Sequence, residues 1–321
     1  MSKFTHSIIV TGGTSGLGFH ATTILAKQFK DAKVVIAARK DPELAAAKIN
    51  KKNGQNNVEF LSLDLGKHES IRAFVKTLKD QQLPPVSHLL LNAGLQFPGE
   101  IQYTSDGIEA TFGINHVGHA LLFHLLQPSL ANKCRIVVVS SGTHDPAQKS
   151  GLPDAIYDTA EELAHPKGEA LNYAGRQRYA TSKLCNVLWT YALSRRVSKL
   201  PGKNITVVAF DPGLMPGTGL ARESGPVLRF VWHYVLPALI PLLRRAFHPN
   251  VHTSQQSGAN LAFIATDGSA AMKSGVYYEM RKEIPSSIDS YVESKQEDLW
   301  AWTVRTLAST EQERKEFEVV A

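Results

Sequence analysis

The sequence alternates short apolar runs, rich in β-branched residues, with longer amphipathic segments from residue 7 to residue 213. The longer segments repeat their apolar residues with a helical period, and turn residues such as Asn53-Gly54 end them. The predicted strands cover residues 7–13, 33–39, 57–65, 87–94, 134–142 and 204–213, and the predicted helices cover residues 18–30, 42–54, 69–83, 107–130 and 178–197. A strand such as CRIVVVSSG is apolar on both faces, which is typical of a parallel sheet covered by helices on both sides. The alternation therefore predicts an α/β protein with a doubly wound parallel sheet.

Nothing in the sequence divides the chain into two folding units. Its 321 residues would suffice for two ordinary domains. No internal repeat, low-complexity segment or Pro/Gly/Ser-rich linker separates such units, however. We therefore expect a single domain over residues 1–321 with a helical elaboration towards its C-terminal end. The tail, residues 281–321, has a charged helical pattern, and Trp300 and Trp302 are expected to dock it.

Charge and cysteine usage narrow the class of protein. With 35 basic and 29 acidic residues the net charge is +6, and no run of five positive residues occurs. We therefore expect a solvated surface and no nucleic-acid partner. Cys134 and Cys185 lie inside apolar segments, which predicts free thiols in a reducing compartment. The first residues, MSKFTHSIIVTGG, contain no secretory segment, so we expect a cytoplasmic protein. The histidines show no metal-binding spacing, and no metal is expected.

The turn TGGTSGLG joins the first predicted strand to the first predicted helix. Gly12 would let the chain turn tightly off the strand, Gly16 would let the backbone approach a pyrophosphate, and Gly18 would let the helix pack closely on the sheet. The free N–H groups and the positive dipole end of the helix would then face the phosphates. A plain connecting turn is the alternative, but the position between strand and helix favours a dinucleotide site. The sheet is accordingly expected to be Rossmann-type.

The end of the second strand bears on the choice of dinucleotide. NAD sites place an acidic residue there for the ribose 2′-hydroxyl, whereas NADP sites use a basic residue for the 2′-phosphate. The sequence reads Ala38-Arg39-Lys40, with no acid before Asp41. An Arg can hold a phosphate with two parallel hydrogen bonds. We therefore expect NADP(H), although a surface Arg at a strand end is the alternative.

The stretch RYATSK places Tyr179 and Lys183 four residues apart, on one face of a predicted helix. An exposed pair would carry no function. In a buried pair, the lysine charge is expected to lower the pKa of the phenol from its ordinary value near 10. Tyr179 would then exchange a proton near neutral pH.

Taken together, these motifs resemble the short-chain dehydrogenase/reductase family. The similarity extends over roughly residues 6 to 280 and rests on elements in one chain order: Thr11-Gly12-x-x-x-Gly16-x-Gly18, Asp64-Leu65, Asn92-Ala93-Gly94, Asn115, Ser141, Tyr179-x-x-x-Lys183 and Pro212-Gly213. Each motif alone is weak, whereas all of them in this order are specific. The insertion between Ser141 and Tyr179 and the stretches YATSKLCN and SGVYYEM resemble the retinol-dehydrogenase-like and protochlorophyllide-reductase-like branches.

The resemblance implies a role for each of these positions. Tyr179 would be the general acid and base, and Lys183 would also hydrogen-bond the nicotinamide ribose. Ser141, rather than Ser140, would hold the substrate oxygen. Asn115 would hold a water in a proton relay to the lysine, with a plain polar helix residue as the alternative. The remaining positions would contact the cofactor: Thr14, Ser15 and Leu17 at the phosphates, Asp64 and Leu65 at the adenine, Asn92, Ala93 and Gly94 along its length, and Pro212, Gly213 and Thr218 near the nicotinamide. Thr218 is equally well explained as a helix cap.

Two segments depart from compact family members. Ser141 and Tyr179 are 38 positions apart, and the polar insertion 143–178 is expected to cover part of the site. The apolar segment 225–247 falls where the family builds a substrate lid. Its large side chains could wall an apolar pocket: Phe230, Trp232, Tyr234, Leu236, Leu239 and Leu242. With its arginines the same segment could instead lie at a membrane surface, or pack on the sheet edge or a second subunit. Internal prolines and charges make it poor for a spanning helix.

The sequence therefore predicts a dinucleotide-binding half (1–142), an inserted loop (143–178) and a third part (179–321) with the catalytic helix, lid and tail. The predicted activity is NADPH-dependent reduction of a ketone or aldehyde on a hydrophobic, ring-containing substrate, with specialised metabolism as one setting. Reduction of a C=C bond, as in protochlorophyllide reductases, is one alternative. An NADP(H)-binding regulator without turnover is another. Membrane contact and a homo-oligomer remain open.

Overall fold

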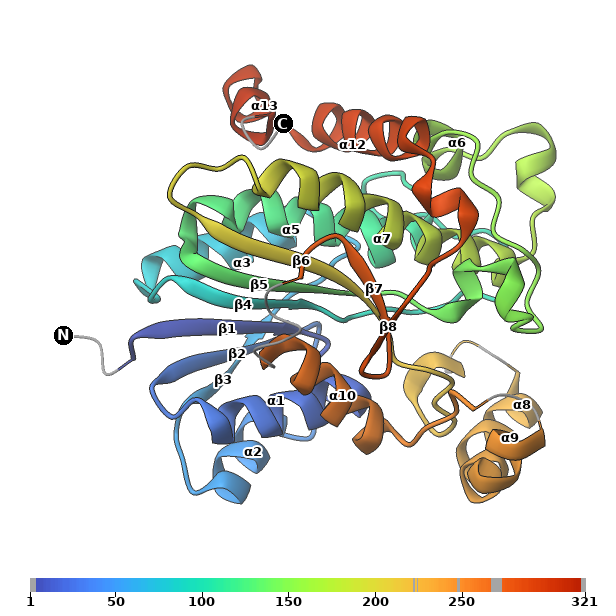
Figure 1. Ribbon diagram of the computed structural model, residues 1–321, viewed down its shortest axis with the longest axis horizontal. Helices are drawn as coiled ribbons and strands as arrows, with labels where there is room; N and C mark the ends of the chain where they lie inside the picture. The colour runs from blue at the N-terminus through green and yellow to red at the C-terminus, as the bar shows by residue number, and fades with distance from the viewer. Residues whose placement is uncertain (1–3, 222, 224, 247–248, 267–272, 319–321) are drawn as a thin grey trace.

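One mixed sheet forms the centre of the molecule (Figure 1). The computed structural model describes residues 4–221, 223, 225–246, 249–266 and 273–318. Within them the strands are β1 (His6–Thr11), β2 (Ala32–Ala38), β3 (Val58–Ser62), β4 (Val86–Leu91), β5 (Leu130–Val139), β6 (Asn204–Asp211), β7 (Val276–Glu279) and β8 (Lys282–Ile284). Their order is β3-β2-β1-β4-β5-β6-β7-β8, and all neighbours pair in parallel except β7 and β8. The predicted doubly wound Rossmann-type fold is therefore confirmed.

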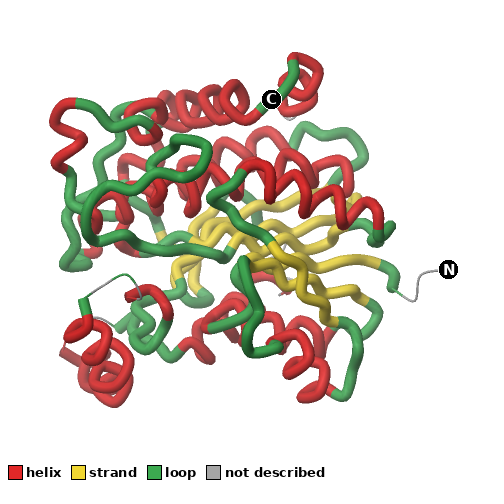
Figure 2. The backbone as a smooth tube through the Cα atoms, turned by 180° about the vertical axis from the view of Figure 1, so that it is seen from behind, coloured by secondary structure: helices red, strands yellow, loops and turns green. Residues whose placement is uncertain are grey.

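Helices cover both faces of the sheet, as the two views show (Figures 1 and 2). On one face lie α1 (Gly16–Gln28), α2 (Ala45–Asn53) and α10 (Ser254–Thr266), which pack over an apolar cluster built around Ile8, Val34 and Leu261. On the other lie α3 (His68–Asp80), α5 (Gly118–Leu126) and α7 (Gly175–Val197), over the larger apolar cluster. The apolar faces of the strands are thus buried on both sides.

Further helices and turns complete the described part of the chain. The remaining helices are α4 (Ala110–Phe112), α6 (Ala160–Ala164), α8 (Pro226–Phe230), α9 (Ile240–Ala246), α12 (Glu293–Leu307) and α13 (Glu311–Glu318). Single turns of π-helix span Gly113–Val117 and Val231–Val235, and 3₁₀ turns span Gln127–Ser129, Gly142–His144, Pro146–Gln148, Gly168–Asn172, Gly219–Ala221, Leu236–Leu239 and Ile288–Tyr291. The tail docks as predicted, because Trp300 and Trp302 are buried in the larger cluster where α12 packs on α7.

Several elements differ from the sequence-based prediction. The helix predicted over 107–130 begins at residue 110, and a π-helical turn interrupts it, with α5 ending before Pro128. Strand β5 begins four residues earlier than predicted, because Leu130 already pairs with Val86 of β4. The sheet also gains β7 and β8, which the strand pattern did not predict.

Close backbone contacts fix the start of helix α7. A Cβ atom added to Gly175 would lie 1.9 Å from the carbonyl oxygen of Phe97, so only glycine lets this helix approach the loop after β4. The helix therefore begins at residue 175, before the predicted residue 178, and it carries Tyr179 towards the carboxyl edge of the sheet.

Candidate active site

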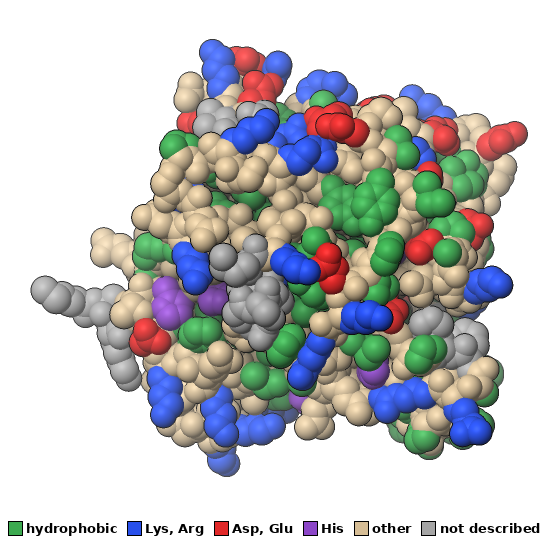
Figure 3. Space-filling view, in the orientation of Figure 1, with side chains coloured by type: hydrophobic (Ala, Val, Ile, Leu, Met, Phe, Trp, Pro, Cys, Tyr) green, Lys and Arg blue, Asp and Glu red, His purple; other side chains and the backbone are tan. Residues whose placement is uncertain are grey.

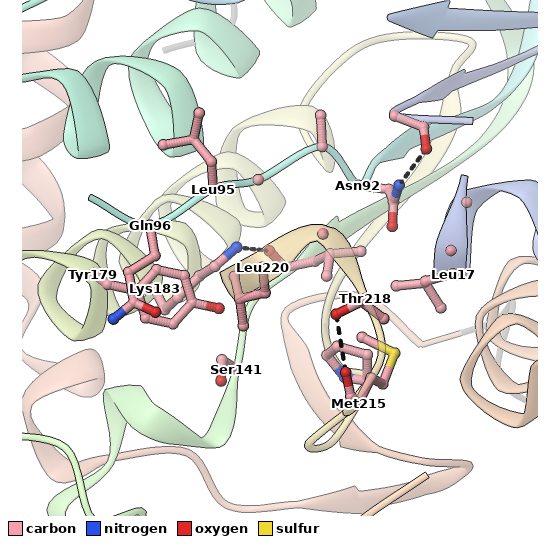
Figure 4. Close-up of a pocket in the computed structure, with 18 of the residues that line it drawn as sticks. Leu17, Asn92, Leu95, Gln96, Ser141, Tyr179, Lys183, Met215, Thr218 and Leu220 are labelled. Atoms are coloured by element: carbon pink, nitrogen blue, oxygen red, sulfur yellow. Dashed lines mark hydrogen bonds between the residues drawn. The ribbon is translucent and has the colours of Figure 1, made fainter. Parts of the chain in front are cut away.

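A cleft of about 1230 Å³ lies at the carboxyl ends of the parallel strands. Residues that follow β1, β2, β3, β4, β5 and β6 all line it, and the order of the sheet reverses between β1 and β4. Open α/β sheets bind ligands at such a reversal point. Of the predicted site residues, all except Asn115 line this cleft. In Figure 4, Tyr179, Lys183 and Ser141 lie towards one end of it and Leu17 and Asn92 towards the other.

The glycine turn forms one wall. Gly12 and Gly16 adopt φ angles of +68° and +52°, which L side chains rarely adopt. A Cβ atom on Gly18 would lie 2.4 Å from the carbonyl oxygen of Gly12, so the turn and the first turn of α1 are in close contact. Thr14, Ser15 and Leu17 line the same wall. Because α1 begins at Gly16, the N–H groups of its first turn have no partner within the helix and are available to an anion.

Cationic side chains stand where β2 ends. Arg39 and Lys40 line the cleft and are exposed to solvent. Asp41, the first acid after β2, accepts a hydrogen bond of 2.8 Å from the Ala45 N–H and so caps helix α2. Asp41 is therefore engaged away from the cleft. Asp64, Leu65 and Lys67 line the adjoining wall after β3.

The residues after β4 are tied to β1. The Asn92 side chain donates to the Thr11 carbonyl oxygen over 2.7 Å, and the backbone N–H groups of Asn92 and Ala93 both donate to the Thr11 hydroxyl. These bonds hold the two strand ends at the reversal point. Gly94 faces the catalytic side, since a Cβ there would lie 3.4 Å from the Lys183 Nζ.

Tyr179 and Lys183 share the inner face of α7, as predicted, and both are buried. The Lys183 Nζ lies 5.7 Å from the centroid of the Tyr179 ring and donates to the Val139 carbonyl oxygen over 3.2 Å. The lysine is thus anchored to the end of β5 while its charge lies beside the phenol ring. Both residues line the cleft.

The expected lowering of the Tyr179 pKa is wrong for this geometry. Burial raises the pKa of the phenol, and the nearby Asp211 carboxylate raises it further, whereas a hydrogen bond with Ser141 opposes both. Burial also lowers the pKa of Lys183 to about 8, and Asp211 partly counteracts this. Spacing along a helix shows that two groups meet, but burial decides which protonation state each prefers. At neutral pH Tyr179 is therefore a protonated phenol beside a mostly charged lysine.

The structure distinguishes Ser141 from Ser140. The Ser140 hydroxyl donates to the Lys183 carbonyl oxygen over 2.8 Å and is buried, so it is occupied by the backbone of α7. Ser141 is half-buried, and its side chain lies near Tyr179, with which it hydrogen-bonds (Figure 4). Its hydroxyl also accepts a long 3.3 Å bond from the Thr143 N–H. Ser141 is therefore the serine that can contact a substrate.

Asn115 lies close to the site but does not line the cleft. It lies in the π-helical turn, fully buried, and its amide bonds both backbone groups of Leu95 at 2.9 Å. It also donates to the Ser182 hydroxyl over 3.0 Å. In this arrangement Asn115 braces the loop after β4 against helix α7, behind Gly94. The proton-relay role stays a prediction.

The positions that were predicted to lie near the nicotinamide surround an acidic residue that the sequence analysis did not identify. Asp211 ends β6, is buried, and accepts hydrogen bonds of 2.9 Å from the Gly213 N–H and the Asn250 side chain. Pro212 and Gly213 line the cleft beside it. The Thr218 hydroxyl donates to the Met215 carbonyl oxygen, while the Thr218 methyl group faces Gly16 across the cleft. The only signal for Asp211 was its place at the end of a strand, before a Pro-Gly turn.

The predicted apolar wall is only partly correct. Of the six large side chains named for it, Trp232 lines the cleft, and its indole N–H donates to the Thr218 carbonyl oxygen over 2.9 Å. Phe230, Tyr234, Leu239 and Leu242 are exposed instead. These side chains are exposed because one face of the helical segment packs on the body and the other faces solvent. Phe247, which also belongs to the predicted segment, lies outside the described residues. Leu228 of the same segment also lines the cleft, but most of the apolar lining comes from other elements, namely Leu95, Pro98, Leu152, Leu214, Met215 and Leu220.

The inserted segment contributes its first part to the site. Gln148, Lys149, Ser150 and Leu152 line the cleft opposite the glycine turn. Arg176, near the end of the segment, lines the cleft as well. Between these parts the segment packs on the tail, where the Asp298 carboxylate accepts hydrogen bonds from Tyr157 and Ala160. The prediction that the insertion covers part of the site is correct for its first residues and for Arg176.

The residues present fit a dinucleotide cofactor. Gly16 faces open space, because a Cβ there would meet only the Thr218 methyl group at 3.9 Å, so a bound group can approach its backbone. The start of α1 offers anion-binding N–H groups, and Arg39 and Lys40 stand at one end of the same cleft.

Comparison with known proteins agrees with this architecture. A short chain dehydrogenase family model matches residues 6–151, and an AcuH dehydrogenase domain model matches residues 221–315. The chloroplastic protochlorophyllide reductase of Daucus carota is 32% identical over 299 residues, which cover 87% of this chain and 71% of that protein. The chain belongs to the short-chain dehydrogenase/reductase family. It is an oxidoreductase of the branch that includes the protochlorophyllide reductases, and a nicotinamide dinucleotide is its cofactor.

Other family members with similar sequence identity to this chain carry names that describe different activities or roles. The polyprenol dehydrogenase of Danio rerio is 32% identical, covering 91% of this chain and 83% of that one. The chloroplastic short-chain dehydrogenase TIC 32 B of Brassica napus is 33% identical, covering 77% and 79%. A solved structure from Mycobacterium paratuberculosis shares the fold, with a TM-score of 0.66, 23% identity and coverage of 95% and 94%.

Proposed function

We propose that this protein is an NADPH-dependent reductase that converts a ketone or aldehyde of a hydrophobic, ring-containing substrate to an alcohol. The observation that carries the proposal is the meeting of Ser141, Tyr179 and Lys183 at the apolar end of a cleft whose other end carries Arg39 and Lys40. Residues 1–142 hold the dinucleotide in this proposal. The first part of segment 143–178 and the third part of the chain complete the substrate side.

The protonation states support reduction. NADPH, when bound, supplies the hydride that reaches the carbonyl carbon. The buried Tyr179 holds its proton at neutral pH and donates it from its hydroxyl to the substrate oxygen. The charge of Lys183 then stabilises the phenolate that is left, and the Ser141 hydroxyl holds the substrate oxygen in place. The raised pKa keeps the phenol protonated at neutral pH, and its proton leaves only when the incoming hydride makes the substrate oxygen strongly basic.

Cofactor choice rests on the charges after β2. Arg39 and Lys40 are available to a 2′-phosphate, and Asp41 caps α2 in place of binding a ribose hydroxyl. These positions favour NADP(H) over NAD(H). The two cysteines are free and buried, which fits a cytoplasmic setting.

Reduction of a C=C bond is the second candidate. The similarity to protochlorophyllide reductases, which extends over most of this chain, favours it. In that case Tyr179 would protonate carbon or an enolate. Product analysis by NMR separates the two, since one reaction yields an alcohol and the other a saturated C–C bond.

The Tyr179→Phe substitution tests the proposal. With a screen of lipophilic carbonyl compounds, followed through NADPH absorbance, kcat is expected to fall by roughly 10²–10⁴-fold because the proton donor is gone. NADPH affinity, measured by fluorescence titration, should change little. Tyr191→Phe is the matched control, because Tyr191 lies on the same helix and is equally buried but bonds Ser286 away from the cleft.

Two results would contradict the proposal. If turnover survives Tyr179→Phe, the phenol is not the proton donor. If wild-type protein binds NADPH but turns over no carbonyl or enone, and its biological activity survives the substitution, the chain is an NADP(H)-binding regulator.

A further inference from the structure

An apolar helical segment projects from the body beside the cleft. Residues 226–246 form one run through α8, a π turn, a 3₁₀ turn and α9, at the lower right of Figure 1. This run is long and apolar enough to cross a membrane by length and composition, with a mean hydropathy of 1.4 and only 6% of its most apolar window buried. Val227, Tyr234 and Leu242 are 78%, 72% and 58% exposed. A surface this apolar calls for a covering partner.

The charges of the segment indicate the kind of partner. No Asp or Glu occurs between residues 226 and 246, whereas Arg229, His233, Arg244 and Arg245 do. Arg229 and Arg245 are exposed, near opposite ends of the run. Figure 3 shows basic side chains beside hydrophobic ones on this corner of the molecule. Basic residues flanking an exposed apolar face complement anionic lipid headgroups, whereas a second copy would bring like charges together.

The segment is held against the body along its inner side. The Trp232 indole donates to the Thr218 carbonyl oxygen, the Gly217 N–H donates to the Trp232 carbonyl oxygen over 2.8 Å, and Arg244 donates to the Val251 carbonyl oxygen. A helix that spanned a bilayer would have to give up these bonds. Pro237 and Pro241 also interrupt its hydrogen bonding. The geometry therefore fits a segment that lies along a surface, with its outer face in lipid.

We propose that residues 226–246 dock on an anionic lipid surface and that the cleft receives its substrate from that surface. The second part rests on the proposed function. Leu228 and Trp232, on the same run, line the cleft, while Val227 and Tyr234 face outward. The mouth of the cleft therefore lies beside the docked face, and a hydrophobic carbonyl compound can pass from the acyl chains to Tyr179 without crossing water.

Vesicle co-sedimentation of the full chain tests the docking. Wild-type protein is expected to bind phosphatidylcholine vesicles that contain phosphatidylserine, and to bind pure phosphatidylcholine vesicles more weakly. The triple variant Val227→Ser/Tyr234→Ser/Leu242→Ser should bind at least about tenfold more weakly, because it loses the apolar contacts. Arg229→Gln/Arg245→Gln should lose about fivefold for each charge removed.

A matched control separates docking through residues 226–246 from nonspecific adsorption to the vesicles. Tyr103, Leu171 and Ile288 are exposed apolar side chains elsewhere, and their triple Ser variant should bind vesicles like wild type. Circular dichroism and NADPH binding check that each variant is folded. Turnover of a water-soluble carbonyl compound by the Val227/Tyr234/Leu242 variant should be unchanged, whereas turnover of a vesicle-borne one should fall.

Three outcomes would overturn the docking proposal. The first is that wild-type protein fails to bind the anionic vesicles. The second is that both triple variants bind these vesicles equally well. The third is that sedimentation velocity shows a dimer that only the Val227/Tyr234/Leu242 substitutions dissociate, in which case a second copy covers the face. Vesicle binding needs no turnover, so its failure is distinguishable from failure of the proposed reductase activity.

Discussion

A buried ion pair holds the start of the catalytic helix, and breaking it gives a quantitative test of the structure. The Arg178 Nε lies 3.3 Å from the Glu109 Oε1, and the two side chains are only 8% and 2% exposed. Arg178 precedes Tyr179 directly, and its guanidinium also donates to the carbonyl oxygens of Tyr173 and Gly99. The pair therefore fixes where Tyr179 enters the cleft.

The expected cost follows from the distance. At an effective dielectric constant of about 20, two charges 3.3 Å apart attract by ~5 kcal/mol. Removing one partner of a buried pair typically costs ~3–5 kcal/mol, because the other charge stays buried without compensation. Glu109→Gln should lie near the lower value. Arg178→Met should lie near the upper one, since it also loses two backbone hydrogen bonds. A loss of ~4 kcal/mol lowers the Tm by about 6 °C, given an unfolding entropy of ~2.1 cal/mol/K for each of 321 residues.

The two variants should differ in their dependence on pH. Burial already raises the pKa of Glu109 above its ordinary value of 4.5, and Arg178 opposes this. In Arg178→Met the pKa rises further, so folded protein binds a proton that the unfolded chain has lost. Its stability should therefore fall as pH rises above about 4.5 towards the raised pKa. Glu109→Gln removes the titrating carboxyl, so the stability of this variant should show no change with pH that originates at this pair.

Urea unfolding at several pH values measures both effects, alongside kcat. The exposed pair Lys76–Asp80 provides the control, because Lys76→Met should cost less than about 1 kcal/mol. The double variant Glu109→Gln/Arg178→Met should cost less than the two single costs added together. If Glu109→Gln costs under about 1 kcal/mol, or if Arg178→Met is equally unstable at all pH values, the pair does not hold the helix as described.

Two further predictions concern the cofactor and the proton donor. The Lys183 pKa of about 8 predicts an alkaline limb near that pH in the wild-type kcat/KM profile. Asp211→Asn should move this limb to lower pH, because Asp211 raises the pKa of both Lys183 and Tyr179. An unmoved limb would mean that the Asp211 charge does not act on these groups. Arg39→Asp should raise the KM for NADPH by roughly 10–100-fold, the loss of one or more charge-assisted hydrogen bonds, and should improve NADH relative to NADPH. Equal effects on both cofactors would show that Arg39 does not contact the 2′-phosphate.

Much of the fold was predictable because its signals are local. Apolar strands separated by amphipathic helices lead to a parallel sheet, and the order of the strands places Gly12, Asn92 and Ser141 at one edge. The short strands β7 and β8 carry too few residues for a clear period-two pattern. The π-helical turn at Asn115 depends on tertiary contacts with Leu95 and Ser182 that no local pattern encodes.

The remaining site features depend on burial. The spacing of Tyr179 and Lys183 correctly predicted a shared helix face, but the direction of the pKa shift depends on desolvation and on Asp211, which comes from a different strand. Segment 226–246 is apolar around most of its circumference, so periodicity did not distinguish its inner side from its outer one.

The contacts of the C-terminal tail bear on which substrates the active site can admit. Its Asp298 accepts hydrogen bonds from the Tyr157 hydroxyl and the Ala160 N–H, and its Glu297 pairs with Arg196 of α7. One helix near the C-terminus thus clamps the far side of the insertion to the back of the catalytic helix. Sequence change on that remote surface can therefore re-shape the substrate entrance while the nucleotide half stays as it is, which gives this scaffold a way to acquire new substrates.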